Sequence, residues 1–423
     1  MRRLLLLFVL LTSIGTPSLA QNRAEDEYTR YELLAPETNS FRITYDVTAV
    51  TPGAKYFFNP IRKGSEARDE SVIDLMTGAP LAFREIGGRQ ARDAGLAEAD
   101  LETHYIQVTL ARPVPDGGEG RIRILKTYKD PKSYYREGDA IVFNRSLGIK
   151  RNAIVLPAGY ELLAANVPVQ VIEEADGRIA ASFLNPYPGE APLEIRARAL
   201  RHATAPTPGE RGTVNRTTSN TPQVAADAPP PERPMNQIRV TERALQDREI
   251  VYFLKQPETH AFSLYHDYTA SREGEHQYVN VVRAGSTVSE PSARTLDSGE
   301  ALKTRTLTGA DIAREKIDIP DRVDPDTQVV LIPFTPVPKG GSIRLRISET
   351  YTDPARYDLI DGQLMWHRSF GRPRNDMVLP DGWYLTTSSI PAVVSREPDG
   401  RIRLSFWNPR PDNVDVFVRG RKR

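Results

Sequence analysis

Apolar and polar residues alternate along much of this chain, as they do in β-strands that bury one face. In the segments 41–47 and 343–348 every second residue is apolar and the residues between them are polar. Helical patterns are confined to two short segments, 91–102 and 309–316. The pattern therefore predicts an all-β protein built from antiparallel β-sandwiches.

Two Asp-Gly pairs, at 176–177 and 399–400, mark the positions of expected hairpins. Apolar residues flank each pair, and the glycine can adopt the positive φ that a tight primed turn requires. An Asn-Pro pair follows each of them, at 185–186 and 408–409, and we expect it to end the returning strand.

The chain repeats itself at a nearly constant spacing. The first recurring motif begins at 36 and again at 257, and a later one begins at 113 and again at 336. Such self-similarity indicates a duplicated domain. The recurring motifs are Pro36-Glu37-Thr38 and Pro257-Glu258-Thr259, Pro113-Val114-Pro115 and Pro336-Val337-Pro338, Thr127-Tyr128 and Thr350-Tyr351, Leu156-Pro157 and Leu379-Pro380, and Asp176-Gly177-Arg178 and Asp399-Gly400-Arg401.

The repeats predict two homologous β-sandwich domains in tandem, at 28–202 and 245–421. Between them, the segment 203–237 is rich in Pro, Thr and Ala and offers almost no large apolar side chain. Such a segment cannot offset the entropy lost on ordering. We expect a disordered linker that lets the two domains move relative to each other.

The first twenty residues resemble a secretory signal. Arg2 and Arg3 precede the apolar run 4–11, and small residues stand at Ser18 and Ala20. Cleavage near Ala20 would release a periplasmic or secreted protein. No later apolar run is long enough to span a bilayer, so we expect no membrane insertion. The chain has no cysteine, so we expect neither a disulfide nor a lipid anchor.

The charges of the chain are balanced, with 56 Lys and Arg against 55 Asp and Glu. This balance gives no electrostatic reason to expect nucleic acid or an anionic membrane as a partner. One basic cluster, 419–423, stands at the C-terminus, and we expect it to be a solvated tail.

The local motifs of common enzymes are missing from the sequence. None of the six histidines lies in a His-Glu-x-x-His pair or in another compact metal-ligand spacing. There is no Gly-x-Ser-x-Gly elbow, no phosphate-binding Gly-x-x-x-x-Gly-Lys and no dinucleotide fingerprint. We therefore expect no metal and no cofactor.

Three histidines of the second repeat stand where the first repeat has another residue. His266 lies on the same face of its predicted strand as the apolar residues around it, so we expect a ring at the edge of the core with one hydrogen bond. Its neighbour Asp267 points to the opposite face, which argues against a catalytic pair. The three substitutions are His260 for Asn39, His266 for Tyr45 and His367 for Asn144.

The segments 141–146 and 364–369 share an aromatic residue, a polar residue, Arg and Ser in the same order. A core aromatic with a structural arginine explains this pattern, and we favour that interpretation. The alternative is a recognition surface, because aromatic residues and arginine are common where partners bind. Its candidate binding residues are Phe143, Arg145, Trp366, His367, Arg368 and Trp383.

The segment 256–262, Gln-Pro-Glu-Thr-His-Ala-Phe, resembles the opening of the N-terminal β-sandwich of the glycyl-aminopeptidase-like peptidases, family M61. The segment 379–383 is similar to the stretch that precedes their catalytic domain. The zinc-binding His-Glu-x-x-His helix of that family is missing, and the first repeat has Asn39 at the histidine position. The resemblance implies the accessory fold without peptidase activity.

Together these observations favour a non-enzymatic binding or assembly protein that recognises a protein, a peptide or an envelope polymer. The alternative is a periplasmic hydrolase of glycan or peptide, with a site dispersed over loops of the second domain around His367, Arg368 and Asp361. A third hypothesis is a purely structural chain whose two domains pack against each other permanently.

Overall fold

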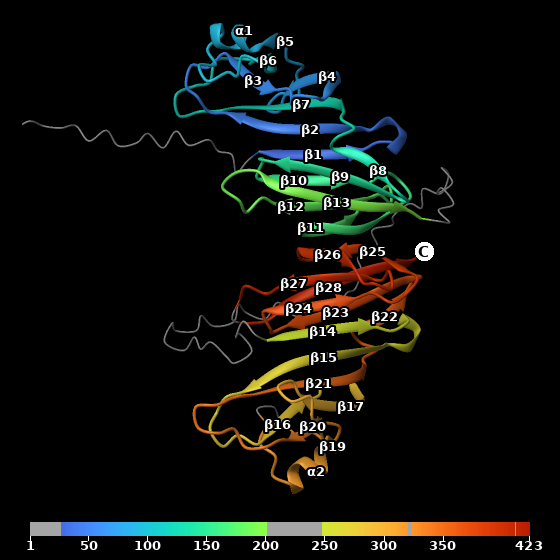
Figure 1. Cartoon of the computed structure of the whole chain (residues 1–423). Helices are drawn as coiled ribbons and strands as arrows, with labels where there is room; N and C mark the ends of the chain where they lie inside the picture. The colour runs from blue at the N-terminus through green and yellow to red at the C-terminus, as the bar shows by residue number, and fades with distance from the viewer. Residues whose placement is uncertain (1–26, 201–247, 320–322, 411) are drawn as a thin grey trace, which may run out of the picture.

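The structure, a computed structural model, describes residues 27–200, 248–319, 323–410 and 412–423. The predicted signal peptide, 1–20, and the predicted linker, 203–237, lie outside the described residues. Within these residues nearly all regular structure is β, which confirms the predicted all-β class (Figure 1). We call 27–200 the first half and 248–423 the second half.

The first half is built on a twisted main sheet that is antiparallel except where β1 and β10 run parallel. Inward-facing apolar residues alternate with polar ones along its strands, as the sequence predicts. Its strands, in spatial order, are β4 (Glu66–Asp74), β7 (Gly120–Lys129), β2 (Ser40–Ala49), β1 (Tyr28–Leu33), β10 (Arg151–Val155), β12 (Ile179–Leu184) and β11 (Tyr160–Glu173).

Two smaller sheets belong to the same half. The long strand β11 leaves the main sheet and joins a second sheet, with the order β8, β9, β13 and β11. A third sheet, β3, β6 and β5, carries the short helix α1 (Gly88–Asp93). The additional strands are β8 (Tyr134–Glu137), β9 (Ala140–Leu147), β13 (Ala191–Ala199), β3 (Tyr56–Pro60), β6 (His104–Thr109) and β5 (Phe83–Gly87).

The second half repeats this succession of elements. Its main sheet comprises β17 (Thr287–Thr295), β21 (Ile343–Thr352), β15 (Ala261–Ala270), β14 (Glu249–Leu254), β24 (Arg374–Val378), β27 (Ile402–Trp407) and β26 (Ala392–Arg396), and the short β18 (Ala301–Leu302) pairs with β17. Its second sheet comprises β22 (Tyr357–Ile360), β23 (Gln363–Phe370), β28 (Val414–Lys422) and β25 (Trp383–Ser388). Its third sheet comprises β16 (Gln277–Val281), β20 (Gln328–Pro333) and β19 (Arg305–Thr308), which leads into α2 (Gly309–Arg314).

A short 3₁₀ turn precedes each long strand β2 and β15, at Pro36–Thr38 and Pro257–Thr259. The next residue is left-handed in both halves, Asn39 with φ 50° and His260 with φ 52°. Each side chain hydrogen-bonds an equivalent backbone carbonyl, that of Tyr134 or Tyr357, over 3.0 Å. The change from Asn39 to His260 therefore preserves a structural contact.

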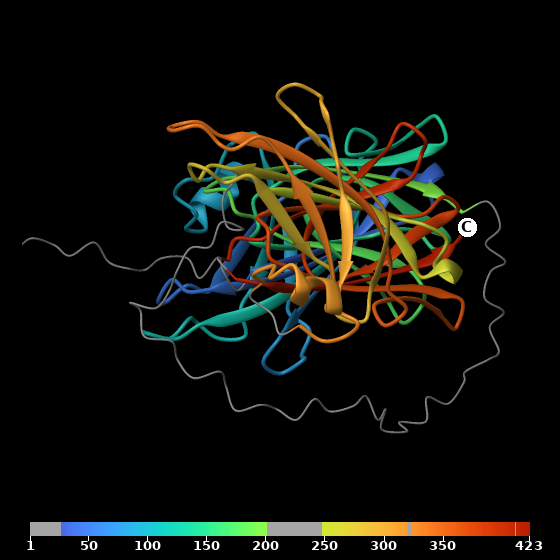
Figure 2. The same cartoon turned by 90° about the horizontal axis from the view of Figure 1, so that it is seen from below.

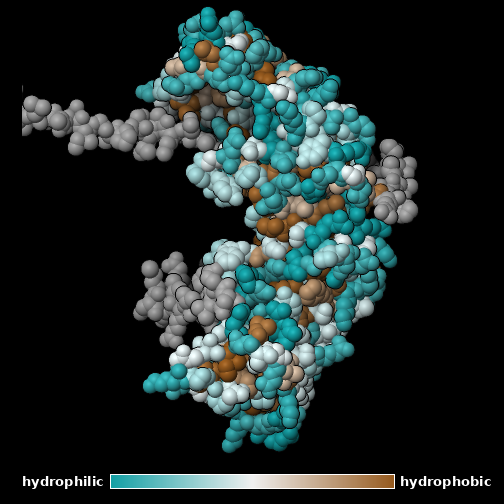
Figure 3. All heavy atoms as spheres, in the orientation of Figure 1, coloured by the Kyte–Doolittle hydropathy of each residue, from teal (hydrophilic) through white to brown (hydrophobic). Residues whose placement is uncertain are grey.

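The two halves are stacked end to end and joined by strand pairing (Figures 1 and 2). Strand β11 of the first half pairs antiparallel with β26 of the second, with Val169 opposite Ala392. Buried apolar residues of both halves form one continuous core, and hydrophobic residues reach the surface near the junction (Figure 3). The expectation of domains that move independently does not agree with this interface.

The basic C-terminal cluster takes part in the same interface. It lies in β28 and just after it, so the prediction of a solvated tail at 419–423 is wrong. The Nε atom of Arg423 lies 2.8 Å from Oε2 of Glu161, and Arg421 pairs with Glu173 over 2.7 Å. Acidic partners on β11 therefore fix the cluster, which sequence spacing alone could not reveal.

Two local predictions need correction. The helix expected at 91–102 is α1, which ends at Asp93 because Gly95 turns the chain with φ 107°. Both Asp-Gly hairpins form, but each has a three-residue loop in which only the glycine, Gly177 or Gly400, has positive φ. A type I turn followed by a left-handed glycine replaces the expected primed turn.

Candidate functional site

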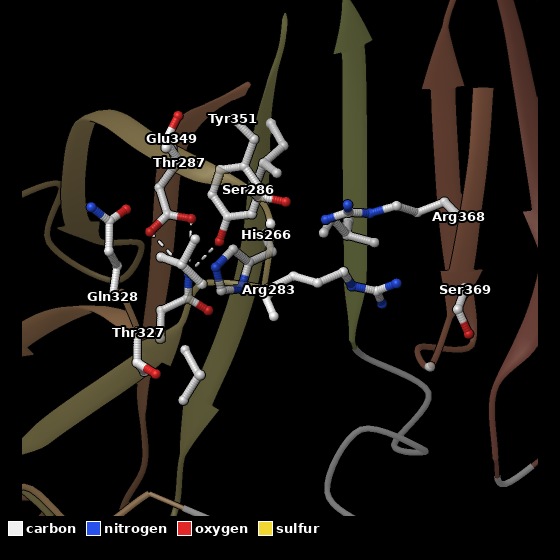
Figure 4. A pocket seen from close by; sticks show the side chains of 18 of the residues that line it. His266, Arg283, Ser286, Thr287, Thr327, Gln328, Glu349, Tyr351, Arg368 and Ser369 are labelled. Carbon is white, nitrogen blue, oxygen red and sulfur yellow. Dashed lines mark hydrogen bonds between the residues drawn. The ribbon is translucent and has the colours of Figure 1, made fainter. Parts of the chain in front are cut away.

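A pocket of about 870 Å³ opens in the second half, between the main sheet, the third sheet and the end of β23. Its lining comes from β14, β15, β16, β21 and β23, from Thr308 at the end of β19, and from the segments 282–287, 324–328 and 371–375, which reach the first residues of β17, β20 and β24. The strands fix most of the lining side chains, because each belongs to a hydrogen-bonded sheet (Figure 4).

Two arginines extend toward one another from opposite sides of this pocket (Figure 4). Arg283 follows β16, is half-buried, and has no hydrogen-bond acceptor for its guanidinium among the residues described. Burial lowers the pKa of Arg283, and the positive charge of Arg368 lowers it further. The pocket thus holds two cations that repel each other.

Asp353 anchors the second of these arginines. This carboxylate is fully buried just after β21, and its Oδ2 accepts hydrogen bonds from Nη1 of Arg368 over 2.9 Å and from Oγ of Ser286 over 2.8 Å. Arg356 donates to the same carboxylate over 3.3 Å. The Nε–H of Arg368 has no acceptor within the described chain. Asp353 therefore holds Arg368 and the loop after Arg283 in one arrangement.

Glu349 contributes a buried carboxylate to another part of the lining. Only 3% of this residue is exposed, and both carboxylate oxygens accept from Nδ2 of Asn280, over 2.9 and 2.8 Å. The same nitrogen lies 3.1 Å from the hydroxyl of Tyr351. No cation pairs with Glu349 in the described part of the chain, and burial raises the pKa of Glu349 to about 7.

His266 lies in the same lining and is buried. Its Nδ1 atom accepts a hydrogen bond from Arg372 over 2.8 Å, which places the ring proton of a neutral imidazole on Nε2. Asp267 forms a two-bond pair with Arg346, over 2.8 and 3.0 Å. His266 therefore lies at the edge of the core, as expected, and Asp267 is engaged elsewhere.

Most of the binding residues expected from the sequence lie inside the two sandwiches. The aromatic residues Phe143, Trp366 and Trp383 are buried in the core, and Nε1 of Trp383 donates to Gln256 over 2.9 Å. Arg145 is buried and donates to Asp130 over 2.9 Å, as Arg368 does to Asp353. These five residues do not form an exposed surface, which agrees with the favoured interpretation of core plus structural arginine.

The three residues of the hydrolase hypothesis do not meet. His367 and Arg368 are adjacent on β23 and face opposite sides of its sheet, one exposed and one buried. Asp361 lies in the exposed turn before β23, six residues from His367. The strand from Gln363 to His367 alone spans roughly 13 Å. The structure brings only Arg368 of this group into the pocket.

Three pocket residues, Arg283, Asn280 and Glu349, were not predicted from the sequence. A signal for Glu349 exists, because it shares the inward face of β21 with Ile343, Leu345 and Ile347. The equivalent inward position of β7 is also charged, Lys126. A charged residue at an inward strand position, where an apolar residue is expected, indicates a buried ionisable group. Ionisable groups with perturbed pKa values cluster at functional sites.

The described residues contain no helix that combines the length and the apolar character needed to cross a membrane. Nor do they bring together three or more His, Asp or Glu side chains in an arrangement that could hold a metal ion.

Comparisons with known proteins give structural likenesses at low identity. No family model matches the chain, and no curated protein matches it. An M1 zinc metallopeptidase from Deinococcus radiodurans is 11% identical with a TM-score of 0.27, and the match covers 41% of each chain. A putative protease from Parabacteroides distasonis is 15% identical with a TM-score of 0.25, and covers 41% of this chain and 39% of that one.

An aminopeptidase N family protein from Idiomarina loihiensis is 9% identical with a TM-score of 0.25, over 41% of this chain and 29% of that one. The chain thus covers less than half the length of each of these three structures. The structural likeness to these three proteins is partial, since each match covers 41% of this chain.

Proposed function

We propose that this chain is an exported, non-enzymatic binding protein, and that the pocket of its second half holds an anionic group of its ligand. The observation that carries the proposal is Arg283, a half-buried cation without an acceptor among the described residues and beside a second cation, Arg368. Desolvation and like-charge repulsion both disfavour this arrangement. A bound carboxylate or phosphate would relieve both.

The contacts of the pocket support binding more than hydrolysis. The hydroxyl of Ser286 donates to Asp353, and Nδ1 of His266 accepts from Arg372. Asp353, the carboxylate beside Ser286, is already held by Arg368 and Arg356, and Nδ1 of His266 is occupied by Arg372, so neither is free to act as the base of a nucleophile. His367, the histidine of the hydrolase hypothesis, lies on the exposed face of β23.

Export and duplication are parts of the same proposal. The N-terminal segment 1–20 supports export to the periplasm or beyond, and the repeated succession of strands supports a duplicated sandwich. Mass spectrometry of the protein from the periplasmic fraction tests export, because the proposal expects a mature chain that begins near Gln21.

Titration calorimetry of the full-length protein with inorganic phosphate, acetate and succinate tests the binding site. At least one anion should bind, and Arg283→Gln should weaken it by about tenfold or more, because a charge-assisted hydrogen bond is lost. Arg294→Gln, which alters an exposed arginine outside the pocket, is the matched control. Equal binding by both variants, or no binding of any anion, would contradict the proposal.

A further inference from the structure

The charges of the pocket are of opposite sign at its two ends. Arg283 and Arg368 provide the cationic end, and Glu349 provides a carboxylate at the other (Figure 4). Tyr351 lies between them, since its hydroxyl is near Asn280 and its ring lies below the guanidinium of Arg368, 5.8 Å from it. Two charged sites are thus separated by about one tyrosine side chain.

Glu349 is incompletely compensated by the protein. A buried carboxylate without a cation costs several kcal/mol, and hydrogen bonds from neutral groups offset only part of that cost. Asn280 supplies a single donor nitrogen for both oxygens, and the neutral hydroxyl of Tyr351 is a further hydrogen-bond partner of the carboxylate. The remaining lone pairs of the carboxylate can therefore take a further donor, and a donor with a positive charge would stabilise it most.

The first half shows that the scaffold does not itself require this carboxylate. In the repeat, the place of Glu349 is taken by Lys126 in the first half, and the place of Asn280 is taken by Asn59. Nζ of Lys126 donates to Oδ1 of Asn59, whereas Nδ2 of Asn280 donates to Glu349. In the first half the amide oxygen of the asparagine faces the lysine ammonium, and in the second half the amide nitrogen of the asparagine faces the glutamate carboxylate.

The sign of the charge at this place is therefore free to serve a ligand. We infer that the pocket selects a zwitterion, whose anion lies between Arg283 and Arg368 and whose ammonium-type cation hydrogen-bonds Glu349. The inference rests on the proposed function. The proposed function places the anionic group of the ligand in the pocket, and the inference adds a site for a cationic group at the other end of the same ligand. Opposite charges at two ends of one pocket give specificity through complementarity.

The test uses ω-amino acids, from 3-aminopropanoate to 6-aminohexanoate, each compared with the alkanoate of the same length. Calorimetry on the full-length protein measures both affinities. At one length the amino acid should bind about tenfold or more tightly than its alkanoate, because it adds a charge-assisted hydrogen bond. This comparison needs no variant, so it holds even if a substituted protein fails to fold.

Variants then assign the preference to Glu349. Glu349→Gln should reduce the affinity ratio toward one, while Glu300→Gln, which alters an exposed carboxylate outside the pocket, should leave the ratio as it is. Glu349→Lys, which copies the first half, should reverse the preference toward dicarboxylates such as succinate.

The outcomes separate the inference from the proposed function. If amino acid and alkanoate bind equally at every length and Arg283→Gln weakens both, the inference that the pocket selects a zwitterion is wrong. The proposed anion site then stands. No binding of either series overturns both. A ratio that persists in Glu349→Gln also overturns the inference, because the ammonium then binds elsewhere.

Discussion

Lys126 and Glu349 occupy equivalent places in the two halves and carry opposite charges. Both are buried, at 5% and 3% exposure, and both have an asparagine as hydrogen-bond partner. Burial lowers the pKa of Lys126 to about 7, with a contribution from Arg145, and raises the pKa of Glu349 to about 7. Neither Lys126 nor Glu349 forms an ion pair within the described residues.

The surroundings of the two charges are alike. Asp130 with Arg145 in the first half matches Asp353 with Arg368 in the second, and each pair has an Nη1 to Oδ2 distance of 2.9 Å. A serine hydroxyl, that of Ser65 or Ser286, donates to each carboxylate. The comparison separates a shared scaffold, which holds the fold, from a charge that differs and can serve recognition.

Removing the shared carboxylate should have the largest effect. Asp353→Ala leaves Arg368 buried without its counter-charge, and breaking such a pair costs up to about 5 kcal/mol. Asp130→Ala should cost a similar amount, because Arg145 is equally buried. Urea unfolding measures both free energies. A large loss in one half and none in the other would show that the scaffold is not shared.

Replacing Lys126 should raise stability near neutral pH. Its folded pKa, about 7, lies below its usual 10.5, so the folded state binds fewer protons between these values. The free energy of unfolding of the natural protein therefore rises with pH from 7 to 10.5. Lys126→Met should remove this rise and be more stable at pH 7 by on the order of 4 kcal/mol. Unfolding measured at a series of pH values checks the slope, which an unchanged profile would contradict.

Replacing Glu349 should change the opposite part of the pH profile. Its folded pKa, about 7, lies above the usual 4.5, so the folded state binds more protons in that window. Stability then falls as the pH rises from 4.5 to 7 and stays lower above it. Glu349→Gln should abolish this fall and be more stable above pH 7 by about 3 kcal/mol. If the free energy of unfolding of the variant falls by the same amount between pH 4.5 and 7, another ionisable group causes the fall.

The smallest expected effect concerns the junction of the halves. Arg423→Gln removes an ion pair with Glu161, whose other partner Arg198 remains over 2.7 Å. We expect a loss of about 1 kcal/mol, because Arg423 is partly exposed and one partner of Glu161 is kept. Small-angle scattering should show the same compact particle for variant and natural protein. An extended particle for either would mean that strand pairing does not hold the halves together.

The sequence predicts the fold better than the site, and the reason is physical. Apolar and polar residues alternate along β2 and β21 because one face of the sheet is buried, and this alternation can be read from neighbouring residues in the sequence. The pocket depends on residues from elements far apart in the chain, such as Asn280 and Glu349, which meet only when the third sheet packs on the main sheet. Arg423 was misjudged for the same reason, since its partner Glu161 is 262 residues away.

Comparison of the recurring motifs in the two halves is a sequence-level route to the site. Comparison of β7 with β21 shows that the inward face of each strand, otherwise apolar, carries one charged residue, and that the two residues, Lys126 and Glu349, have opposite charges. Among the histidine substitutions, His260 repeats the structural contact of Asn39, whereas His266 lines the pocket. A charge difference at an inward position therefore points to the site as directly as the change from Tyr45 to His266 does.

The most direct test of the account is the ionisation of Glu349, followed by carbon NMR of its carboxyl group in the full-length protein, with Glu349→Gln to assign the signal. We expect a pKa of about 7 for Glu349 in the free protein. The pKa should fall when an ω-amino acid binds, and should not fall with the alkanoate of equal length, because only the ammonium stabilises the ionised carboxylate. An ordinary pKa in the free protein, or the same response to both ligands, would contradict it.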